Sequence, residues 1–330
     1  MSALTLLDVD NLCVTLPTAS GPLSAVRGVS LNLRRGETLG IVGESGCGKS
    51  MTALSLLNLL PSGAKATMSR YAFDGETVTG RGKRGIRNLR GNRIGMIFQE
   101  PMTALNPVFP IGSQLTAVYR RHKGGSEAAA RERAVMLLER VGISNAAARL
   151  AQFPHQLSGG LRQRVMIAMA LMCEPSLIIA DEPTTALDVT IQMQILKLLA
   201  DIKTAFGTGL ILITHDLGVV SHVADKIAVM YAGEVVETGR TAEILAAPRH
   251  PYTVGLLGSL PDPSRTAPGA PLATIPGTVP SLIDPPDACA FADRCARVLP
   301  RCTAAAPALR QDGPGRSIRC VNPEPAAWVA

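Results

Sequence analysis

The segment of residues 39–61 places the tightest constraint on how this chain can fold. A short apolar stretch, residues 39–42, runs directly into a glycine-rich turn, and residues 49–60 have a helical composition that ends at Pro61. Glycines let successive backbone N–H groups turn toward one centre, and the helix that follows directs its positive end at the same point. We therefore predict an α/β fold in which a strand, a phosphate-binding loop and a helix follow one another.

The side chains of this loop indicate a nucleotide bound together with Mg²⁺. Lys49 is placed to bridge phosphate oxygens, and the Ser50 hydroxyl is placed to ligate Mg²⁺. We expect Cys47 to act through its backbone, while oxidation of its thiol would inactivate the site. The predicted ATP contacts in this segment are Gly43, Glu44, Ser45, Gly46, Cys47, Gly48, Lys49, Ser50 and Met51.

Two acidic residues follow a second apolar stretch. Asp181 and Glu182 come directly after residues 177–180. An acid at the end of such a strand can reach Mg²⁺ through water, and a second acid can act as general base toward the attacking water. Such a pair is more often part of a solvated loop, but the sequence Pro-Thr-Thr-Ala-Leu-Asp at residues 183–188 makes the hydrolytic interpretation more specific. We predict an ATP hydrolase.

A second candidate anion site precedes a predicted helix that runs to residue 172. Ser158, Gly159 and Gly160 offer a hydroxyl and bare backbone N–H groups at the start of that helix. Taken alone, an ordinary capping serine is the more common explanation. Because this group has no function toward the chain's own nucleotide, we expect ATP to be enclosed between two protein surfaces.

Strand-like and helical segments alternate along most of the chain. Residues 94–98, 177–180 and 210–213 are predicted strands separated by helices, which indicates a largely parallel sheet covered by helices. An antiparallel addition near the N-terminus is expected beside it. Residues 75–93 are polar, basic and broken by glycines, so we predict surface turns there.

The composition changes after about residue 248, where prolines and glycines multiply. We predict a nucleotide-binding domain over residues 1–247, with a helical subdomain over about 101–172, and a C-terminal extension over residues 248–330. The prolines predict an irregular extension without a helical or sheet layer.

Composition limits the possible partners. The chain has 330 residues, a formal net charge of +7 and only 3% aromatic residues. A basic balance suits nucleic acid or an anionic membrane, but it also follows from an arginine-rich composition, and few aromatics argue against base-stacking platforms. The N-terminus does not resemble a signal peptide, and the apolar stretches fall short of the ~18–20 residues that span a bilayer. We expect a cytoplasmic protein that is soluble or membrane-peripheral.

The order and spacing of these motifs resemble the nucleotide-binding subunit of an ATP-binding cassette (ABC) transporter over roughly residues 4–245. Two departures are present: Leu161 stands where glutamine is commonest in the signature, and residues 16–26 lack the aromatic residue that often stacks on adenine. Apolar contacts from Leu16, Pro22 or Leu23 would replace that stacking.

The resemblance implies a function for residues that are unremarkable alone. Gln99 would couple Mg²⁺ and the attacking water to the membrane partner, and His215 would hold the γ-phosphate. Ser158 and Gly160 would contact the γ-phosphate held by the opposite subunit, and Asp188 would act across the dimer. The implied catalytic residues are Glu182, His215 and Gln99, the implied Mg²⁺ ligands are Ser50, Gln99 and Asp181, and the signature contributes Ser158, Gly159, Gly160 and Asp188.

Three further stretches are similar to importers of dipeptides and oligopeptides: residues 98–107, residues 250–253, and the tail through residues 275–295. The resemblance implies uptake of such peptides across the inner membrane. The partners would be a second ABC ATPase subunit (a paralogue or a second copy), two permease subunits and, indirectly, a solute-binding protein. The chain would then lie at the cytoplasmic face of that membrane. Import of nickel or another small solute is the first alternative, and a soluble ABC protein acting on nucleic acid is the second, although we expect no nucleic acid partner.

Four of the seven cysteines crowd the end of the chain, at Cys289, Cys295, Cys302 and Cys320. Disulfides are not expected in a cytoplasmic protein. Relatives with this pattern hold a four-iron cluster, so the resemblance implies a [4Fe-4S] cluster that pins the proline-rich tail. Four thiolates suit iron–sulfur or zinc alike, so zinc is the alternative.

Overall fold

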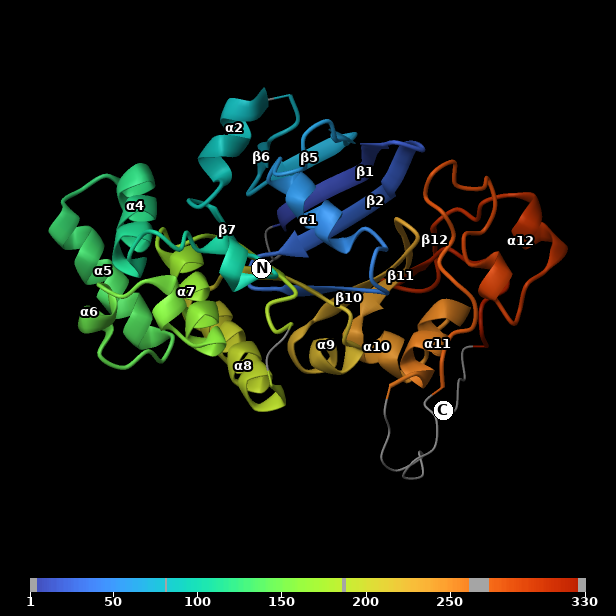
Figure 1. Ribbon diagram of the computed structural model, residues 1–330. Coiled ribbons are helices and arrows are strands. Elements are labelled where there is room, and N and C mark those ends of the chain that lie inside the picture. The colour runs from blue at the N-terminus through green and yellow to red at the C-terminus, as the bar shows by residue number, and fades with distance from the viewer. Residues whose placement is uncertain (1–4, 81, 186–187, 261–272, 326–330) are drawn as a thin grey trace. The chain divides into compact units, whose positions relative to one another are not determined.

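The computed structural model describes residues 5–80, 82–185, 188–260 and 273–325 (Figure 1). The chain divides into two compact units. The first contains the chain up to Leu6, Leu33–Glu37 and Asp74–Ile213, and the second contains Leu7–Asn32, Thr38–Phe73 and the chain from Thr214 onward. Residues 186 and 187 of the motif after Glu182, and residues 261–272 of the proline-rich tail, lie outside the described residues.

Parallel strands form the sheet of the first unit. In order along the sheet they are β9 (Gly209–Thr214), β8 (Leu177–Asp181) and β7 (Ile94–Ile97), and Leu177 lies opposite both Gly209 and Ile94. Every residue of β8 and β9 is buried. Strands of a parallel sheet covered on both faces are continuous apolar stretches of this kind, and the predicted strands are confirmed.

Helices make up most of the remainder of the first unit. The longer ones are α4 (Ile111–Lys123), α5 (Glu127–Arg140), α7 (Gly159–Leu171) and α8 (Val189–Phe206), and the short ones are α3 (Pro101–Ala104), α6 (Ala146–Arg149) and the 3-10 turn η1 (Pro154–Gln156). Figure 1 shows α4, α5 and α7 packed as a group, and these three contact one another. Leu115, Leu137 and Val165 are fully buried in these helices. This segment is helical, as predicted.

One prediction for the first unit was wrong. Residues 75–93 contain β6 (Glu76–Thr77) and the helix α2 (Gly82–Leu89) in place of turns alone. Leu89 is buried and anchors the helix, whose Arg87 and Asn88 are exposed. Burial of one apolar side chain outweighs the weak helix propensity of the glycines in this segment.

The second unit contains an antiparallel sheet near the N-terminus. Its strands are β1 (Thr5–Thr18), β2 (Gly21–Arg34), β4 (Lys65–Thr67) and β5 (Arg70–Phe73). β1 pairs with β5 through Leu7 opposite Phe73 and with β4 through Cys13 opposite Thr67. The Tyr71 hydroxyl donates to Leu56 O over 2.9 Å, which fixes this sheet to helix α1 (Lys49–Leu56). The predicted antiparallel addition is confirmed.

A second sheet in this unit positions the glycine-rich loop. β3 (Thr38–Val42) runs parallel to β10 (Lys226–Tyr231), and β10 pairs antiparallel with β11 (Glu234–Arg240). The helices of this unit are α1, α9 (Leu217–Val223), α10 (Thr241–Ala246), α11 (Pro251–Gly258), the 3-10 turn η2 (Ala292–Arg294) and α12 (Pro300–Ala304). Helix α1 ends earlier than predicted, because Asn58 adopts a left-handed conformation with φ of 49°.

The C-terminal extension is more regular than predicted. β13 (Ser317–Ile318) extends the sheet beyond β11, β12 (Arg310–Gln311) pairs with β13, and α11 forms despite the surrounding prolines. Pro251 lies at the first turn of α11, where a missing N–H costs nothing, and the His250 side chain caps the helix. The predicted boundary between residues 247 and 248 stays a prediction.

A buried carboxylate fastens the extension to β11. Glu237 is fully buried and accepts from the backbone N–H of Arg249 and His250 over 2.9 Å and 3.0 Å. It also forms an ion pair with Arg316, next to β13.

Among the described helices, none is long and apolar enough to cross a membrane.

We expect Glu237→Ala to lower the free energy of unfolding by about 3–5 kcal/mol, because it leaves the mostly buried Arg316 cation without its partner. Glu243→Ala, which removes an exposed carboxylate from α10, should cost less than about 1 kcal/mol. Chemical denaturation followed by circular dichroism compares the two variants. Equal losses would show that the ion pair does not stabilise the fold.

Candidate active site

The glycine-rich loop of the second unit connects β3 to α1, and two of its glycines cannot be replaced without distortion. Gly43 has φ of 153°, and a Cβ there would lie 2.2 Å from Met230 O. Gly48 has φ of 99°, and a Cβ there would lie 2.3 Å from Ala25 O. The loop therefore passes so close to two backbone segments that only glycine fits at these two positions.

Lys49 opens helix α1 and turns back onto the loop. Its Nζ donates to Gly43 O over 2.8 Å and to Glu44 O over 2.9 Å, and the side chain is 4% exposed. The ammonium group is thus held within the loop, at the positive end of α1. A fixed cation at a helix N-terminus, next to a glycine-rich loop, is an anion-binding arrangement.

Cys47 contributes to the loop through its backbone. Its N–H donates to Glu44 O over 3.3 Å, and its carbonyl accepts from the Gly233 N–H over 3.1 Å. The side chain is fully buried, and burial raises the pKa of the Cys47 thiol. A protonated, enclosed thiol is a poor target for oxidation, so the predicted oxidative inactivation requires the loop to open first.

The C-terminal extension contacts the loop directly at Glu44. Arg294 Nη1 forms an ion pair with Glu44 Oε2 at 2.9 Å, and the Glu44 N–H donates to the Tyr252 hydroxyl over 2.9 Å. Arg294 is itself held by Ile275 O at 3.1 Å and Pro276 O at 2.9 Å, and its side chain is 6% exposed. The extension therefore orients one residue of the phosphate loop.

An aromatic cluster supports this contact. The rings of Tyr231 and Tyr252 lie 4.7 Å apart, and Phe291 packs edge-on against both. The Arg294 guanidinium lies 5.7 Å from the centre of the Tyr231 ring. Sequence analysis noted Tyr252 and Arg294 only as part of a family pattern and missed their contact with the loop, because a pattern of residue types does not show which loop the residues reach.

The acidic pair of the first unit lies at the end of β8. Asp181 is buried as the last residue of the strand, and Glu182 follows with φ of 44°. Glu182 Oε2 accepts from Gln99 Nε2 over 3.1 Å and from the Thr185 hydroxyl over 2.8 Å. Two donors on one oxygen orient the carboxylate. The structure therefore brings Gln99 and Glu182 together, and it adds Thr185, which sequence analysis did not single out.

The left-handed backbone at Glu182 is unusual for a residue with a side chain. Such a conformation costs on the order of 1–3 kcal/mol and persists only where the surroundings enforce it. Here the Glu182 N–H donates to Ile213 O over 2.9 Å, and the Thr185 N–H donates to Glu182 O over 3.2 Å. These two hydrogen bonds hold the backbone of Glu182 in this conformation at the end of the strand.

Two helix N-termini lie side by side in the first unit. Ser158 caps α7 by accepting from the Leu161 N–H over 3.4 Å, and Asp188 caps α8 by accepting from the Ile191 N–H over 2.9 Å. A Cβ on Gly160 would lie 3.3 Å from Ile191 Cγ2, so the two helix starts are close. Ser158, Gly159 and Asp188 are exposed. The arrangement offers an anion-binding surface that faces outward.

His215 belongs to the second unit, as does the phosphate loop. It is exposed and directly precedes Asp216, whose carboxylate caps α9 by accepting from the Gly218 and Val219 N–H groups over 2.8 Å and 3.2 Å. The cap fixes the chain direction where His215 emerges. Gln99, the segment Ser158 to Gly160, Asp181, Glu182 and Asp188 belong to the first unit.

The four C-terminal cysteines line one small cavity together with His250, Pro251 and Phe291. All four are free thiols. Cys302 Sγ accepts from the Leu299 N–H over 3.4 Å, and Cys320 Sγ accepts from the Asn322 N–H over 3.3 Å. Burial raises the pKa of Cys320 to about 11, and the neighbouring thiols add to that shift. Within the described residues, no group of three or more His, Cys, Asp or Glu side chains could hold a metal ion as it stands.

We expect Arg294→Met to weaken binding of Mg-ATP by roughly 5- to 30-fold, because a charge-assisted contact worth about 1–2 kcal/mol that orients the loop is lost. Arg297→Met is the matched control, since Arg297 pairs with Glu324 at 3.4 Å within the same extension. Titration with a fluorescent nucleotide gives both dissociation constants. Equal weakening in the two variants would mean that Arg294 acts only through the stability of the extension.

Comparison with known proteins covers both the site and the extension. The ABC transporter family profile matches residues 26–185, and the profile for the oligopeptide/dipeptide transporter C-terminal region matches residues 236–302. The chain is 50% identical to the dipeptide transport ATP-binding protein DppD of Bacillus subtilis over 95% of this chain and 93% of that protein. It is 47% identical to the oligopeptide transport ATP-binding protein OppD of Salmonella typhimurium over 96% and 94% of the two chains.

A solved structure supports the same assignment. A dimeric ATP-binding cassette in a post-hydrolysis state, bound to ADP and Pi, superposes with a TM-score of 0.64 at 28% identity, over 72% of this chain and 99% of that one. The predicted ABC ATPase fold is therefore confirmed, and the predicted ATP hydrolase activity is that of the family. The chain belongs to the ABC transporter family, as an ATP-binding protein that carries the oligopeptide/dipeptide transporter C-terminal region.

Proposed function

We propose that this chain powers the uptake of dipeptides and oligopeptides across the inner membrane by hydrolysing ATP. One observation carries the proposal: the similarity to proteins of dipeptide and oligopeptide transport extends through the C-terminal region, beyond the cassette that all ABC ATPases share. A cassette alone would support ATP hydrolysis without a cargo. The extension lies outside the residues that match the ABC transporter profile and matches the profile of oligopeptide/dipeptide transporters, so its match favours peptides.

The phosphate loop binds the nucleotide in this proposal. The loop N–H groups and the Lys49 ammonium neutralise the β- and γ-phosphates, and Ser50, Gln99 and Asp181 would hold Mg²⁺, which would neutralise phosphate charge. Glu182 takes the proton of the attacking water, and Gln99 and Thr185 keep its carboxylate in one orientation. His215 contacts the γ-phosphate. The hydrogen bonds of Glu182 support this assignment.

The exposed helix N-termini act on the nucleotide of a second subunit. Ser158, Gly159 and Gly160 donate to its γ-phosphate, and Asp188 contacts the same interface from the neighbouring helix. Support comes from the outward exposure of these residues and from the dimeric state of the similar solved cassette. The second subunit is a paralogue or another copy of this chain.

A permease contact is supported by apolar side chains that follow Gln99 in the sequence. Val108 is 70% exposed and Phe109 is 52% exposed, although both are large and apolar. The loop that presents them is held by Gln114, whose Nε2 donates to Asn106 O and Phe109 O over 2.9 Å each. An ordered loop with exposed apolar tips is a docking feature. Through it the chain would bind two permease subunits, peripherally at the cytoplasmic face, and act indirectly with a solute-binding protein.

The cysteine cavity holds a [4Fe-4S] cluster in this proposal, with zinc as the alternative. The chemistry of the donor set supports this, because four thiols line one small cavity and two of them already accept backbone N–H bonds, which stabilise thiolate ligands. The thiols would have to lose their protons first, and the positive charge of the metal would favour that deprotonation. Cys289, Cys295, Cys302 and Cys320 would then pin the extension whose Arg294 orients the loop.

We expect cells that lack this gene to lose uptake of labelled dipeptides or longer peptides and to regain it with the wild-type chain. Lys49→Ala and Glu182→Gln should fail to restore uptake, because the first removes the phosphate-binding cation and the second removes the base. The Glu182→Gln protein should still bind ATP and dimerise. A defect confined to Ni²⁺ uptake would show that the transported solute is nickel and not a peptide. ATP turnover that nucleic acid stimulates, without any uptake defect, would show that the chain is not a transport subunit.

We expect anaerobically purified protein to be brown and to contain roughly four iron and four sulfide per chain, as the cluster requires. Cys302→Ser should lose most of the iron and lower the unfolding temperature. The matched control Cys173→Ser, a buried cysteine of the first unit, should keep its iron. Zinc in place of iron would select the alternative, and metal-free wild-type protein would contradict both.

A further inference from the structure

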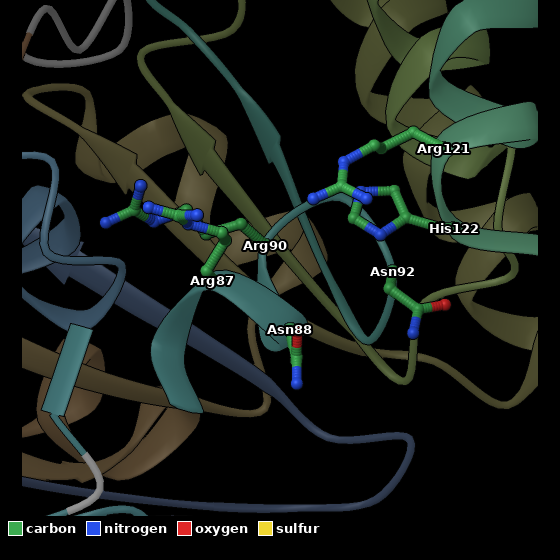
Figure 2. Close-up of a pocket in the computed structure, with 6 residues that line it drawn as sticks. All are labelled: Arg87, Asn88, Arg90, Asn92, Arg121 and His122. Atoms are coloured by element: carbon green, nitrogen blue, oxygen red, sulfur yellow. The ribbon is translucent and has the colours of Figure 1, made fainter. Parts of the chain in front are cut away.

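A basic pocket of about 480 Å³ lies in the first unit, formed by residues to which the proposed function gives no part. Figure 2 shows it between the C-terminal ends of α2 and α4, with the loop that enters β7 forming one wall. Its lining residues are Arg87, Asn88, Arg90, Asn92, Arg121 and His122. Three are arginines, two are amides that offer N–H donors, one is a histidine, and none is acidic.

The arginines of the pocket differ from their sequence neighbours in how they are used. Arg93 pairs with Asp74 at 2.7 Å and with Glu76 at 2.8 Å, and Arg120 pairs with Glu127 at 2.9 Å. By contrast, Arg87 and Arg121 form no ion pair with any carboxylate in the part of the chain that the structure describes. Both are exposed toward solvent. Arg87 and Arg121 therefore bring two positive charges to one space without forming an ion pair in the described residues.

The pocket wall is built by the backbone and is not a chance meeting of surface side chains. The Arg90 N–H donates to Ile86 O over 3.2 Å, and the Gly91 N–H donates to Ile94 O over 2.9 Å. A Cβ on Gly91 would lie 3.2 Å from His122 Nε2, so the α4 end packs closely on this turn. Buried Leu89 anchors α2 beneath it. The cations are thus presented from a fixed scaffold.

The pKa values of two lining residues reflect their burial and the positive charges close to them. Burial lowers the pKa of Arg90, and the nearby Arg87 cation lowers it further. Burial also lowers the pKa of His122, together with the Arg121 and Lys123 cations. Figure 2 shows the Arg121 guanidinium beside the His122 ring. A bound anion would relieve this repulsion.

We propose that this pocket binds a phosphate-bearing anion that carries two neighbouring phosphate groups. The guanidinium fork matches phosphate oxygens bidentately, and three arginines, from two helices and a turn, line this space, more than one phosphate requires. The volume lies within the range of small-ligand sites, about 300–1,000 Å³. The lining has no Phe, Tyr or Trp, which argues against a platform for stacked bases. The pocket shares no residue with the phosphate loop, so it is a separate site.

The test is calorimetric titration of the full chain with inorganic pyrophosphate in EDTA. All chains carry Lys49→Ala, so that the phosphate loop does not contribute. We expect one pyrophosphate per chain, with a dissociation constant that rises at least about tenfold in Arg87→Gln/Arg121→Gln, because two charge-assisted contacts are removed. Arg120→Gln/Arg131→Gln, which removes two cations outside the pocket lining, should change it less than about twofold.

Two results would overturn the proposal. The first is loss of all pyrophosphate binding in the Lys49→Ala chain, which would assign the binding to the phosphate loop. The second is equal weakening by the two double variants, which would show a general charge effect. Circular dichroism and unfolding temperature, compared between the two double variants, separate binding from folding.

A vesicle assay distinguishes the sources of the phosphate. Sedimentation with cardiolipin vesicles, reduced in Arg87→Gln/Arg121→Gln and by excess pyrophosphate, would identify a lipid headgroup. Pyrophosphate binding without vesicle binding would identify a soluble diphosphate. Retention of single-stranded DNA that depends on both arginines, in the absence of pyrophosphate binding, would contradict the proposal and favour nucleic acid.

Discussion

Pairing between fully buried parallel strands is the constraint on which both units depend. No residue of β3, β8 or β9 reaches solvent, so their backbone N–H and C=O groups are satisfied by neighbouring strands. In a parallel sheet the strand ends that carry polar loops all point the same way, and ligands bind outside those ends. The loop after β3 and the acidic pair at the end of β8 are therefore where chemistry is possible, because the interior of these strands is almost entirely apolar and buried.

The polar groups at these ends are held in conformations that relaxed chains avoid. Gly43 and Gly48 have positive φ angles, and the nearby Met230 O and Ala25 O leave no room for a Cβ, so only glycine fits at both positions. Glu182 takes a left-handed conformation and is retained there by two backbone hydrogen bonds. Strain of this kind is tolerated when a packed sheet supplies the stabilisation, and it prepares the groups before a nucleotide arrives.

The C-terminal extension is part of the nucleotide-binding unit and not an attachment to it. Glu237 of β11 fastens it, while Arg294 and the Tyr252 hydroxyl fix Glu44 of the phosphate loop. His250 and Phe291, whose rings pack together, line the cysteine cavity, and Phe291 also belongs to the aromatic cluster beside Arg294. The proposed metal would therefore stabilise a segment that already touches the phosphate loop, which gives the extension a structural reason to accompany this cassette.

The sequence by itself determined the strands, the phosphate loop, the capping of α7 by Ser158 and the nature of the acidic pair, because these depend on local periodicity, glycine and capping chemistry. It failed for α2 and for the short strands of the extension, where a single buried leucine or one strand partner outweighs weak local propensity. Only the tertiary structure decided that Gln99 and Thr185 share Glu182, that Arg294 reaches Glu44, and that arginines gather between α2 and α4. Such contacts join residues far apart in the chain, and their geometry follows from packing, which no local pattern encodes.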